Sequence, residues 1–220
     1  MLYGLLLLSI IFSLAAQALV QINFKRYSGK LNSRGITGAD AARAILDGNG
    51  LQHIRIEHIS GNLTDHFDPT ANVIRLSDGV YNSTSVAAVG VAAHEAGHAV
   101  QHGVGYTPIK LRSAIIPVTQ IGAKLTTPLV LLGLLFSWGA LIDIGIILYC
   151  AVVIFQAVTL PVEFNASARA LAILRDNYIL EGDELDGARK VLIAAALTYV
   201  AAMVSALLSL LRLLALRKRR

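Results

Sequence analysis

Two histidines and a glutamate lie within five consecutive residues of the chain. His94, Glu95 and His98 follow the pattern H-E-x-x-H. On a helix, residues four positions apart share one face, so both imidazoles can reach a single metal ion. Tetrahedral zinc accepts histidine nitrogens, and the glutamate between them can act on a water molecule beside the ion. The spacing therefore predicts Zn²⁺ on His94 and His98, with Glu95 as a catalytic general base.

The same five residues would also fit a helix with two surface histidines. The flanking residues 91–93 and 96–100 are small or apolar and uncharged apart from His98. This composition predicts a buried helix. Buried histidines beside a buried glutamate need partners, because burying a polar group without a hydrogen bond costs roughly 2–7 kcal/mol. The surroundings of the motif therefore favour a metal site.

A catalytic zinc site needs a third protein ligand and one open position. Glu163 lies in an apolar, helix-forming stretch, where a carboxylate is costly unless it is paired or bound to metal. Asp186 competes with it, in an LDG triplet that resembles that of intramembrane site-2-type proteases, but it lies in a charged stretch. His102 is eight residues after His94, about 12 Å along a helix axis, which is too far to share an ion. We therefore expect Glu163 to be the third ligand.

The elements that carry these residues follow from the strongly apolar composition. The 220 residues are 55% hydrophobic and 15% charged, whereas an ordinary soluble domain carries about 25% charged residues. Four apolar runs reach the ~20 residues of a spanning helix: 2–22, 114–136, 139–160 and 191–211. No basic residue precedes the first run, so we expect a retained anchor and no cleaved signal peptide. Two runs separate His94 from Glu163, which returns Glu163 to the same side of the membrane.

The expected fold class is mainly α, a multi-span helical membrane protein with a small α+β catalytic region. Five regions are expected: an N-terminal transmembrane anchor (1–24), a soluble catalytic region (25–112), a transmembrane hairpin (113–160), a third-ligand helix and linker (161–190), and a C-terminal transmembrane helix with a basic tail (191–220). Residue patterns predict strands over 51–60 and 73–77 and a helix over 85–102. The segment 72–77 is a candidate edge strand for pairing with an extended substrate.

The basic residues of the chain point to a membrane and not to nucleic acid. The formal net charge is +5, but aromatic residues make up only 6% and do not alternate with the basic ones. A base-stacking surface is therefore not predicted, and we expect the lipid bilayer as a partner. Ten basic residues border the apolar runs on the catalytic side, against five at the far end. The positive-inside rule then places the active site in the cytoplasm, on a multi-pass protein of the cell membrane.

Three longer stretches carry a resemblance to a known family: DPTANVIRLSDGVYNSTSVAAVGVAAHEAGHAVQH (68–102), PVEFNASARALAIL (161–174) and AAALTYVAA (194–202). Over essentially its whole length the chain resembles the YugP-type membrane zinc metallopeptidases of bacteria. This resemblance implies zinc on His94 and His98, with Glu95 as the base. The motif order is also similar to that of the HtpX and CAAX prenyl protease group of gluzincins, which implies a zincin-like catalytic region.

In that group, a glutamate ligand opens an E-x-x-A-D motif after the helical hairpin, and it corresponds to Glu163 here. The fifth position of this motif is Ser167 in place of the aspartate. That aspartate orients a metal-binding histidine, so the resemblance leaves open which residue has this role here.

These observations predict a zinc-dependent endopeptidase that hydrolyses peptide bonds of membrane or membrane-proximal proteins. One alternative is a site-2-type intramembrane protease that uses Asp186. Another is a non-catalytic metal-binding membrane scaffold, against which Glu95 argues because a scaffold needs the ligands but not the base. A donor for the oxyanion is also needed, and the candidates are Tyr106, Arg169 and Tyr199.

Overall fold

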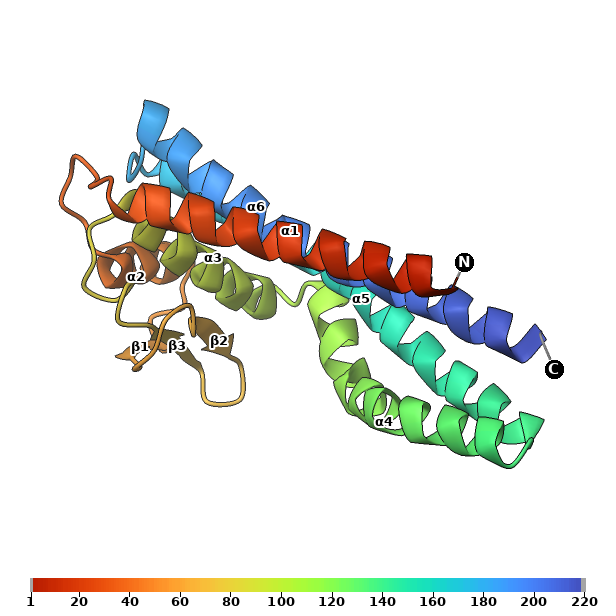
Figure 1. The fold of residues 1–220 in the computed structure, drawn as a ribbon. Helices are drawn as coiled ribbons and strands as arrows, with labels where there is room; N and C mark the ends of the chain where they lie inside the picture. Colours follow the sequence, from red (N-terminus) through yellow and green to blue (C-terminus); the bar gives the residue numbers. More distant parts are fainter. Residues whose placement is uncertain (1, 219–220) are drawn as a thin grey trace. The chain divides into compact units, whose positions relative to one another are not determined.

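The computed structural model describes residues 2–218, so Arg219 and Arg220 of the basic tail lie outside the described residues. The described chain is mainly helical, with one small sheet (Figure 1). The elements in chain order are α1 (Leu2–Ser28), α2 (Gly38–Gly48), β1 (Arg55–His58), β2 (His66–Asp68), β3 (Val73–Leu76), α3 (Val86–Gly103), α4 (Thr107–Leu135), α5 (Gly139–Asp176) and α6 (Gly182–Lys218). The expected fold class, a multi-span helical protein with a small α+β region, is confirmed.

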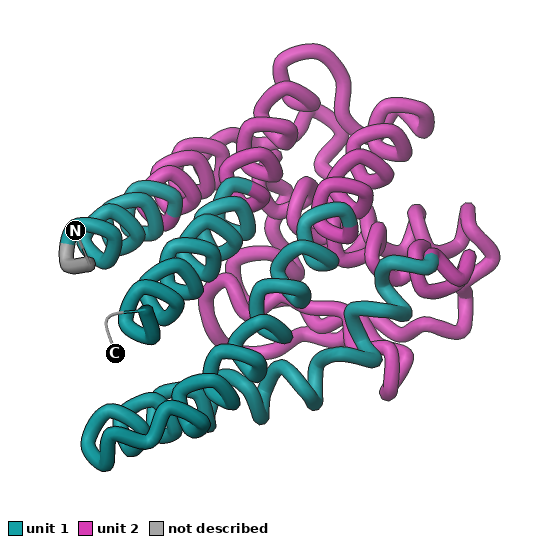
Figure 2. Tube along the Cα trace, turned by 90° about the vertical axis from the view of Figure 1, so that its right-hand side faces the viewer, with its two compact units in different colours: residues 1–16, 107–161, 197–220 teal, residues 17–106, 162–196 magenta. Residues whose placement is uncertain are grey.

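The chain divides into two compact units, which Figure 2 shows in different colours. The first unit comprises residues 1–16, 107–161 and 197–220. The second comprises residues 17–106 and 162–196. The second unit contains the sheet, α2, α3 and every residue of the predicted metal site.

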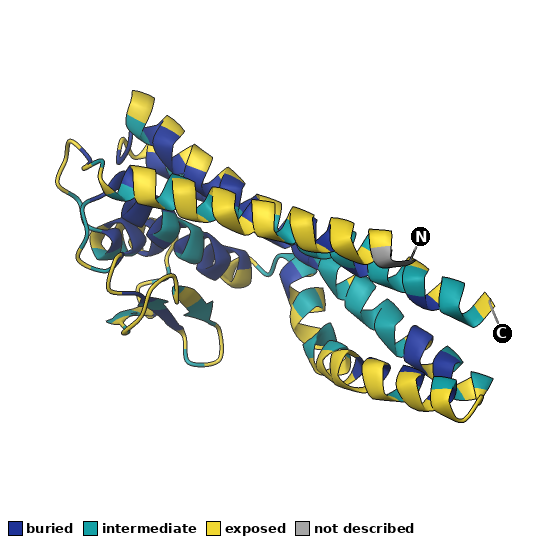
Figure 3. Ribbon diagram, viewed as in Figure 1, coloured by how far each residue is buried: buried dark blue, intermediate teal, exposed yellow. Residues whose placement is uncertain are grey.

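Four helices are long and apolar enough to cross a membrane: Gly4–Ser28, Thr107–Leu135, Gly139–Asp176 and Gly182–Lys218. Much of the surface of α4 is exposed (Figure 3), and its few buried residues include Gly122, Thr126 and Gly133. A Cβ atom on Gly122 would lie 2.6 Å from the carbonyl oxygen of Leu148 on α5. The small residues thus let the two helices of the first unit approach closely, as in membrane-helix packing.

In the second unit, α2 and α3 begin at well-formed N-caps. Thr37 accepts a hydrogen bond from the Asp40 backbone N–H, and the Asp40 carboxylate accepts one in return from the Thr37 backbone N–H. Ser85 accepts a bond from the backbone N–H of Ala88 at the start of α3. These bonds satisfy N–H groups that have no partner within the helix. The predicted helix over 85–102 is therefore observed as α3, with Ser85 as its cap.

Most of α3 is buried in the core of the second unit, as its small apolar residues predict (Figure 3). The core cluster joins α2, the sheet, α3 and the parts of α5 and α6 that belong to this unit. Gly38 of α2 packs so closely that a Cβ atom would lie within 2.4 Å of the carbonyl oxygen of Val80. The helix that carries the two histidines is thus packed against other elements of this unit on several sides.

The sheet has the strand order β1-β3-β2. β1 runs parallel to β3, with Arg55 opposite Val73, and β2 runs antiparallel to it, with Phe67 opposite Ile74. The expectation of a strand over 51–60 is too long, because a turn in which the Ile54 N–H bonds the Leu51 carbonyl precedes β1.

The expectation that residues 72–77 form an edge strand is wrong. β3 is the central strand and is paired on both sides, so its backbone groups are already used within the sheet. The edge next to β3 is taken by β2, a strand of three residues that the sequence analysis did not predict. Asp65, directly before β2, accepts hydrogen bonds from the backbone N–H and the hydroxyl of Ser77. These bonds fasten the start of β2 beside the end of β3.

Candidate metal centre

A close approach of α3 to α5 builds the candidate site. A Cβ atom on Gly97 would lie 2.7 Å from the carbonyl oxygen of Ala166, well inside van der Waals contact. Glycine at the fourth position of the H-E-x-x-H segment therefore lets the two helices meet at backbone level. Glu163 lies three residues before Ala166 and about one helical turn away, so this contact brings it level with the histidines.

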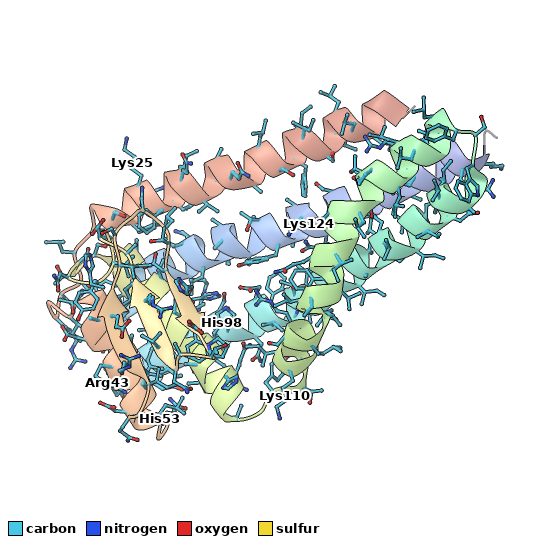
Figure 4. The ribbon with its side chains drawn as sticks, turned by 90° about the horizontal axis from the view of Figure 1, so that it is seen from below. Lys25, Arg43, His53, His98, Lys110 and Lys124 are labelled. Carbon is cyan, nitrogen blue, oxygen red and sulfur yellow. The ribbon has the colours of Figure 1, made fainter. Side chains whose placement is uncertain are left out.

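His94, His98 and Glu163 converge, and their potential ligand atoms all lie within 4.8 Å of one another. Oε2 of Glu163 is 3.2 Å from Nε2 of His94 and 3.4 Å from Nε2 of His98. Zinc bonds of about 2.0–2.2 Å at a tetrahedral angle separate two ligand atoms by about 3.3–3.5 Å. The donor set and its spacing therefore fit a zinc ion. Figure 4 labels His98 among the side chains of this unit.

The cluster is buried and favours positive charge. Glu163 is only 1% exposed and His98 is 9% exposed. Burial opposes protonation of His98, but the hydrogen bond with Glu163 and the negative charges of Glu95 and Glu163 outweigh it and raise the pKa of His98. A group of side chains with this negative charge beside it also suits a bound cation.

Glu95 is half-buried beside the cluster and is held by the sheet. Its Oε2 atom accepts a hydrogen bond of 3.0 Å from the backbone N–H of Phe67 on β2. The Phe67 ring also packs edge-on against His102, with the ring centroids 5.9 Å apart. Sequence reasoning missed this support, because a three-residue strand carries too little periodicity to be recognised.

Each histidine of the cluster has a neutral partner on its other ring nitrogen. Nδ1 of His94 lies 3.1 Å from the hydroxyl of Ser167, and Nδ1 of His98 lies 3.0 Å from Oε1 of Gln101. Ser167 thus contacts His94 from the place where the similar proteases have an aspartate. Gln101 was not anticipated, although its position three residues after His98 puts both on one helical face.

Asp186 and His102 do not join the cluster. Among the described residues, the group that can hold a metal comprises His94, His98 and Glu163. The side chain of Asp186 is 58% exposed and lies 3.4 Å from Arg189, one turn along α6. A Cβ atom on Gly187 would lie 2.7 Å from the ring of Tyr27, so packing accounts for the glycine of the LDG triplet.

The three candidate oxyanion donors have different surroundings. The Nε atom of Arg169 donates to Oδ1 of Asn165 at 2.8 Å. Tyr106 follows α3 in the second unit, where its backbone N–H bonds the Gln101 carbonyl. Tyr199 belongs to the first unit. The oxyanion donor stays a prediction.

Comparison with known proteins relates the chain to zinc metallopeptidases. Residues 2–218 match the family described as "Putative neutral zinc metallopeptidase". The protein named "Putative membrane protease YugP" from Bacillus subtilis (strain 168) is 49% identical over 197 residues, which cover 90% of this chain and 88% of that protein. No solved structure is significantly similar to the chain. The resemblance to YugP-type proteins is thereby confirmed, and the chain belongs to this zinc metallopeptidase family.

Proposed function

We propose that the chain is a zinc-dependent endopeptidase that hydrolyses peptide bonds of membrane or membrane-proximal proteins. The supporting observation is the buried group of two imidazoles and one carboxylate, with a second carboxylate directly beside it. His94, His98 and Glu163 would hold the zinc ion. Three protein ligands leave a fourth position open, as catalytic zinc sites require.

Glu95 supplies the proton transfer. Zinc, when bound, polarises the substrate carbonyl and makes water more acidic. The Glu95 carboxylate accepts a proton from the attacking water and later donates it to the nitrogen of the leaving amine. The hydrogen bond from the Phe67 N–H holds Oε2, which leaves Oε1 to exchange this proton. The base is therefore oriented before the substrate arrives.

The position of Glu163 along α5 supports substrates at the membrane surface. α5 begins at Gly139, and Glu163 is 163 − 139 = 24 residues further along. A span uses about 20 residues of helix, so Glu163 follows directly after a span that starts at Gly139. The positive-inside rule then puts the site on the cytoplasmic side. Cleavage in the middle of the bilayer by way of Asp186 has no support, because that residue is exposed and paired with Arg189.

The substitution Glu95→Gln tests this function. The detergent-purified variant is expected to keep its zinc, because Glu95 is not among the ligands. Its rate of casein hydrolysis is expected to fall by roughly 10²–10⁴-fold, as for loss of a general base. Zinc content by atomic absorption and peptide release by mass spectrometry give both values. Undiminished hydrolysis by the variant would contradict the mechanism, and zinc-loaded wild type without hydrolysis would favour the scaffold.

A further inference from the structure

A line of hydrogen bonds runs from Arg169 to Nδ1 of His98, the ring nitrogen on the opposite side from Glu163. Nε of Arg169 donates to Oδ1 of Asn165 at 2.8 Å, and Nε2 of Gln101 donates to the same oxygen at 3.0 Å. Gln101 Nε2 also donates to the Val162 carbonyl at 2.8 Å, and Gln101 Oε1 meets Nδ1 of His98 at 3.0 Å. The Gln101 side chain is fully buried, so these protein groups are its hydrogen-bonding partners.

The donor and the acceptor of each hydrogen bond in this line can be assigned in turn, starting from the bond that Arg169 donates. A guanidinium group can only donate, so the atom of Asn165 that faces Arg169 must be its oxygen. That oxygen and the Val162 carbonyl are both acceptors, so the atom of Gln101 between them must be the amide nitrogen. The Gln101 oxygen therefore faces His98. A carbonyl oxygen can only accept, so Nδ1 of His98 must carry a hydrogen.

We propose that Gln101, Asn165 and Arg169 are positioning residues that fix the His98 ring with a hydrogen on Nδ1, which leaves Nε2, the atom that faces Glu163, as the nitrogen that binds a metal. This inference rests on the proposed zinc site. A neutral imidazole binds metal through the nitrogen that carries no hydrogen. The line thus selects Nε2 as the ligand nitrogen and orients the ring, and it does so with a neutral amide in place of a carboxylate.

A comparison with His94 shows what this line of hydrogen bonds adds at His98. His94 meets the hydroxyl of Ser167, which can donate or accept. That contact is compatible with either tautomer of His94. His98 faces an acceptor whose orientation is imposed by further bonds, so the hydrogen on its Nδ1 is fixed by the protein itself. Gln101 lies on α3, but Asn165 and Arg169, which orient it, lie on α5 with Glu163 and so couple the third ligand to the second histidine.

The substitution Gln101→Met tests the proposal, because methionine keeps the approximate length of the side chain and removes its polar atoms. Zinc affinity of the full chain in detergent, measured by competition with a chelator, is expected to fall about 10–100-fold, as for other supports of metal ligands. Two variants of Asn165 test the direction of the bonds. Asn165→Asp keeps an acceptor for both donors and should retain zinc affinity within about threefold, whereas Asn165→Leu should weaken it by about tenfold.

Asn32→Leu serves as the structural control. Asn32 is also buried in the second unit, and its amide nitrogen also donates to two backbone carbonyls, those of Ile36 and Thr84. Its loss should lower thermal stability as much as Gln101→Met and leave zinc affinity within about twofold. Visible spectra of the Co²⁺-substituted proteins should change for Gln101→Met only.

Equal zinc affinity in Gln101→Met and wild type would overturn the proposal, as would equal loss in Asn32→Leu. If Gln101→Met does not fold, the zinc affinities of Asn165→Asp and Asn165→Leu test the proposal instead. Equal zinc affinities of these two variants would overturn it. Wild type that binds no zinc would instead overturn the proposed function itself. The failure of the two proposals is therefore distinguishable.

Discussion

The two units of the chain use the same apolar side chains in different ways. In the second unit, leucine, isoleucine, valine and alanine residues gather in one large buried cluster around α3. In the described part of the first unit, the buried cluster comprises Val130, Ile142, Ile146 and Leu213. Large apolar side chains there remain uncovered by protein, such as Leu135 at 74% and Leu14 at 60% exposed.

This difference indicates two solvents. A unit surrounded by water must bury its apolar side chains within itself, whereas a unit surrounded by lipid gains nothing by doing so. The metal site lies in the unit with the internal core, where packing holds each side chain in place. The first unit contains all or part of each of the four helices that are long and apolar enough to cross a membrane, and its exposed apolar side chains are ones that lipid would cover.

The largest expected effect comes from shortening one leucine in each unit. Leu174 is fully buried in the second unit, so Leu174→Ala should lower the free energy of unfolding by about 2–5 kcal/mol. Leu135→Ala removes the same atoms from an exposed position of the first unit and should change it by less than about 0.5 kcal/mol. Unfolding of both variants in the same detergent gives the comparison. Equal losses would refute the distinction between the units.

A charge placed at either of two similarly exposed leucines tests which of the two faces lipid. Leu14 lies near the middle of α1 and is 60% exposed, and Leu31 follows α1 in the second unit and is 67% exposed. Leu14→Asp should disfavour membrane insertion of α1 by roughly 2.5–3.5 kcal/mol, whereas Leu31→Asp should leave it unchanged. A glycosylation reporter on the N-terminus measures the inserted fraction. Unimpaired insertion of Leu14→Asp would show that this part of α1 does not face lipid.

A smaller effect is expected where α3 meets α5. Gly97→Ala places a Cβ atom against the Ala166 carbonyl and should cost about 1–3 kcal/mol of stability, with weaker zinc binding. Gly48→Ala on α2 is the matched control, because a Cβ atom there meets nothing within 4 Å. It should be neutral or stabilise the protein by up to about 1 kcal/mol. Thermal unfolding and zinc titration would compare them, and an unaffected Gly97→Ala protein would show that the close approach is dispensable.

The sequence predicts the helices and their roles better than the sheet. Long apolar runs and the H-E-x-x-H spacing are patterns within single continuous segments of the sequence. The sequence therefore predicts the spanning helices and α3. The even number of predicted spans between them puts Glu163 on the same side as the histidines, but its nearness to them depends on the close approach of α3 and α5 at Gly97. β2 has only three residues, and its pairing with β3 depends on contacts that no local pattern encodes. For the same reason β3 was mistaken for an edge strand.

The support of the site was beyond sequence reasoning. Glutamine three residues after a histidine is common on any helix, and its importance here depends on the burial of Gln101 and on Asn165 of α5. The contact of Ser167 with His94 is likewise a matter of packing, although the family's motif indicates where to look. Such partners become visible only when the separation of α3 and α5 is known.

The central claim is that His94, His98 and Glu163 hold one zinc ion, and zinc content per chain tests it most directly. Detergent-purified wild type is expected to contain about one zinc per chain, and Glu163→Ala is expected to lose most of it. Asp186→Ala, which removes an exposed carboxylate from the same unit, should keep the wild-type content. Full zinc in Glu163→Ala, or loss of zinc in Asp186→Ala, would contradict the account.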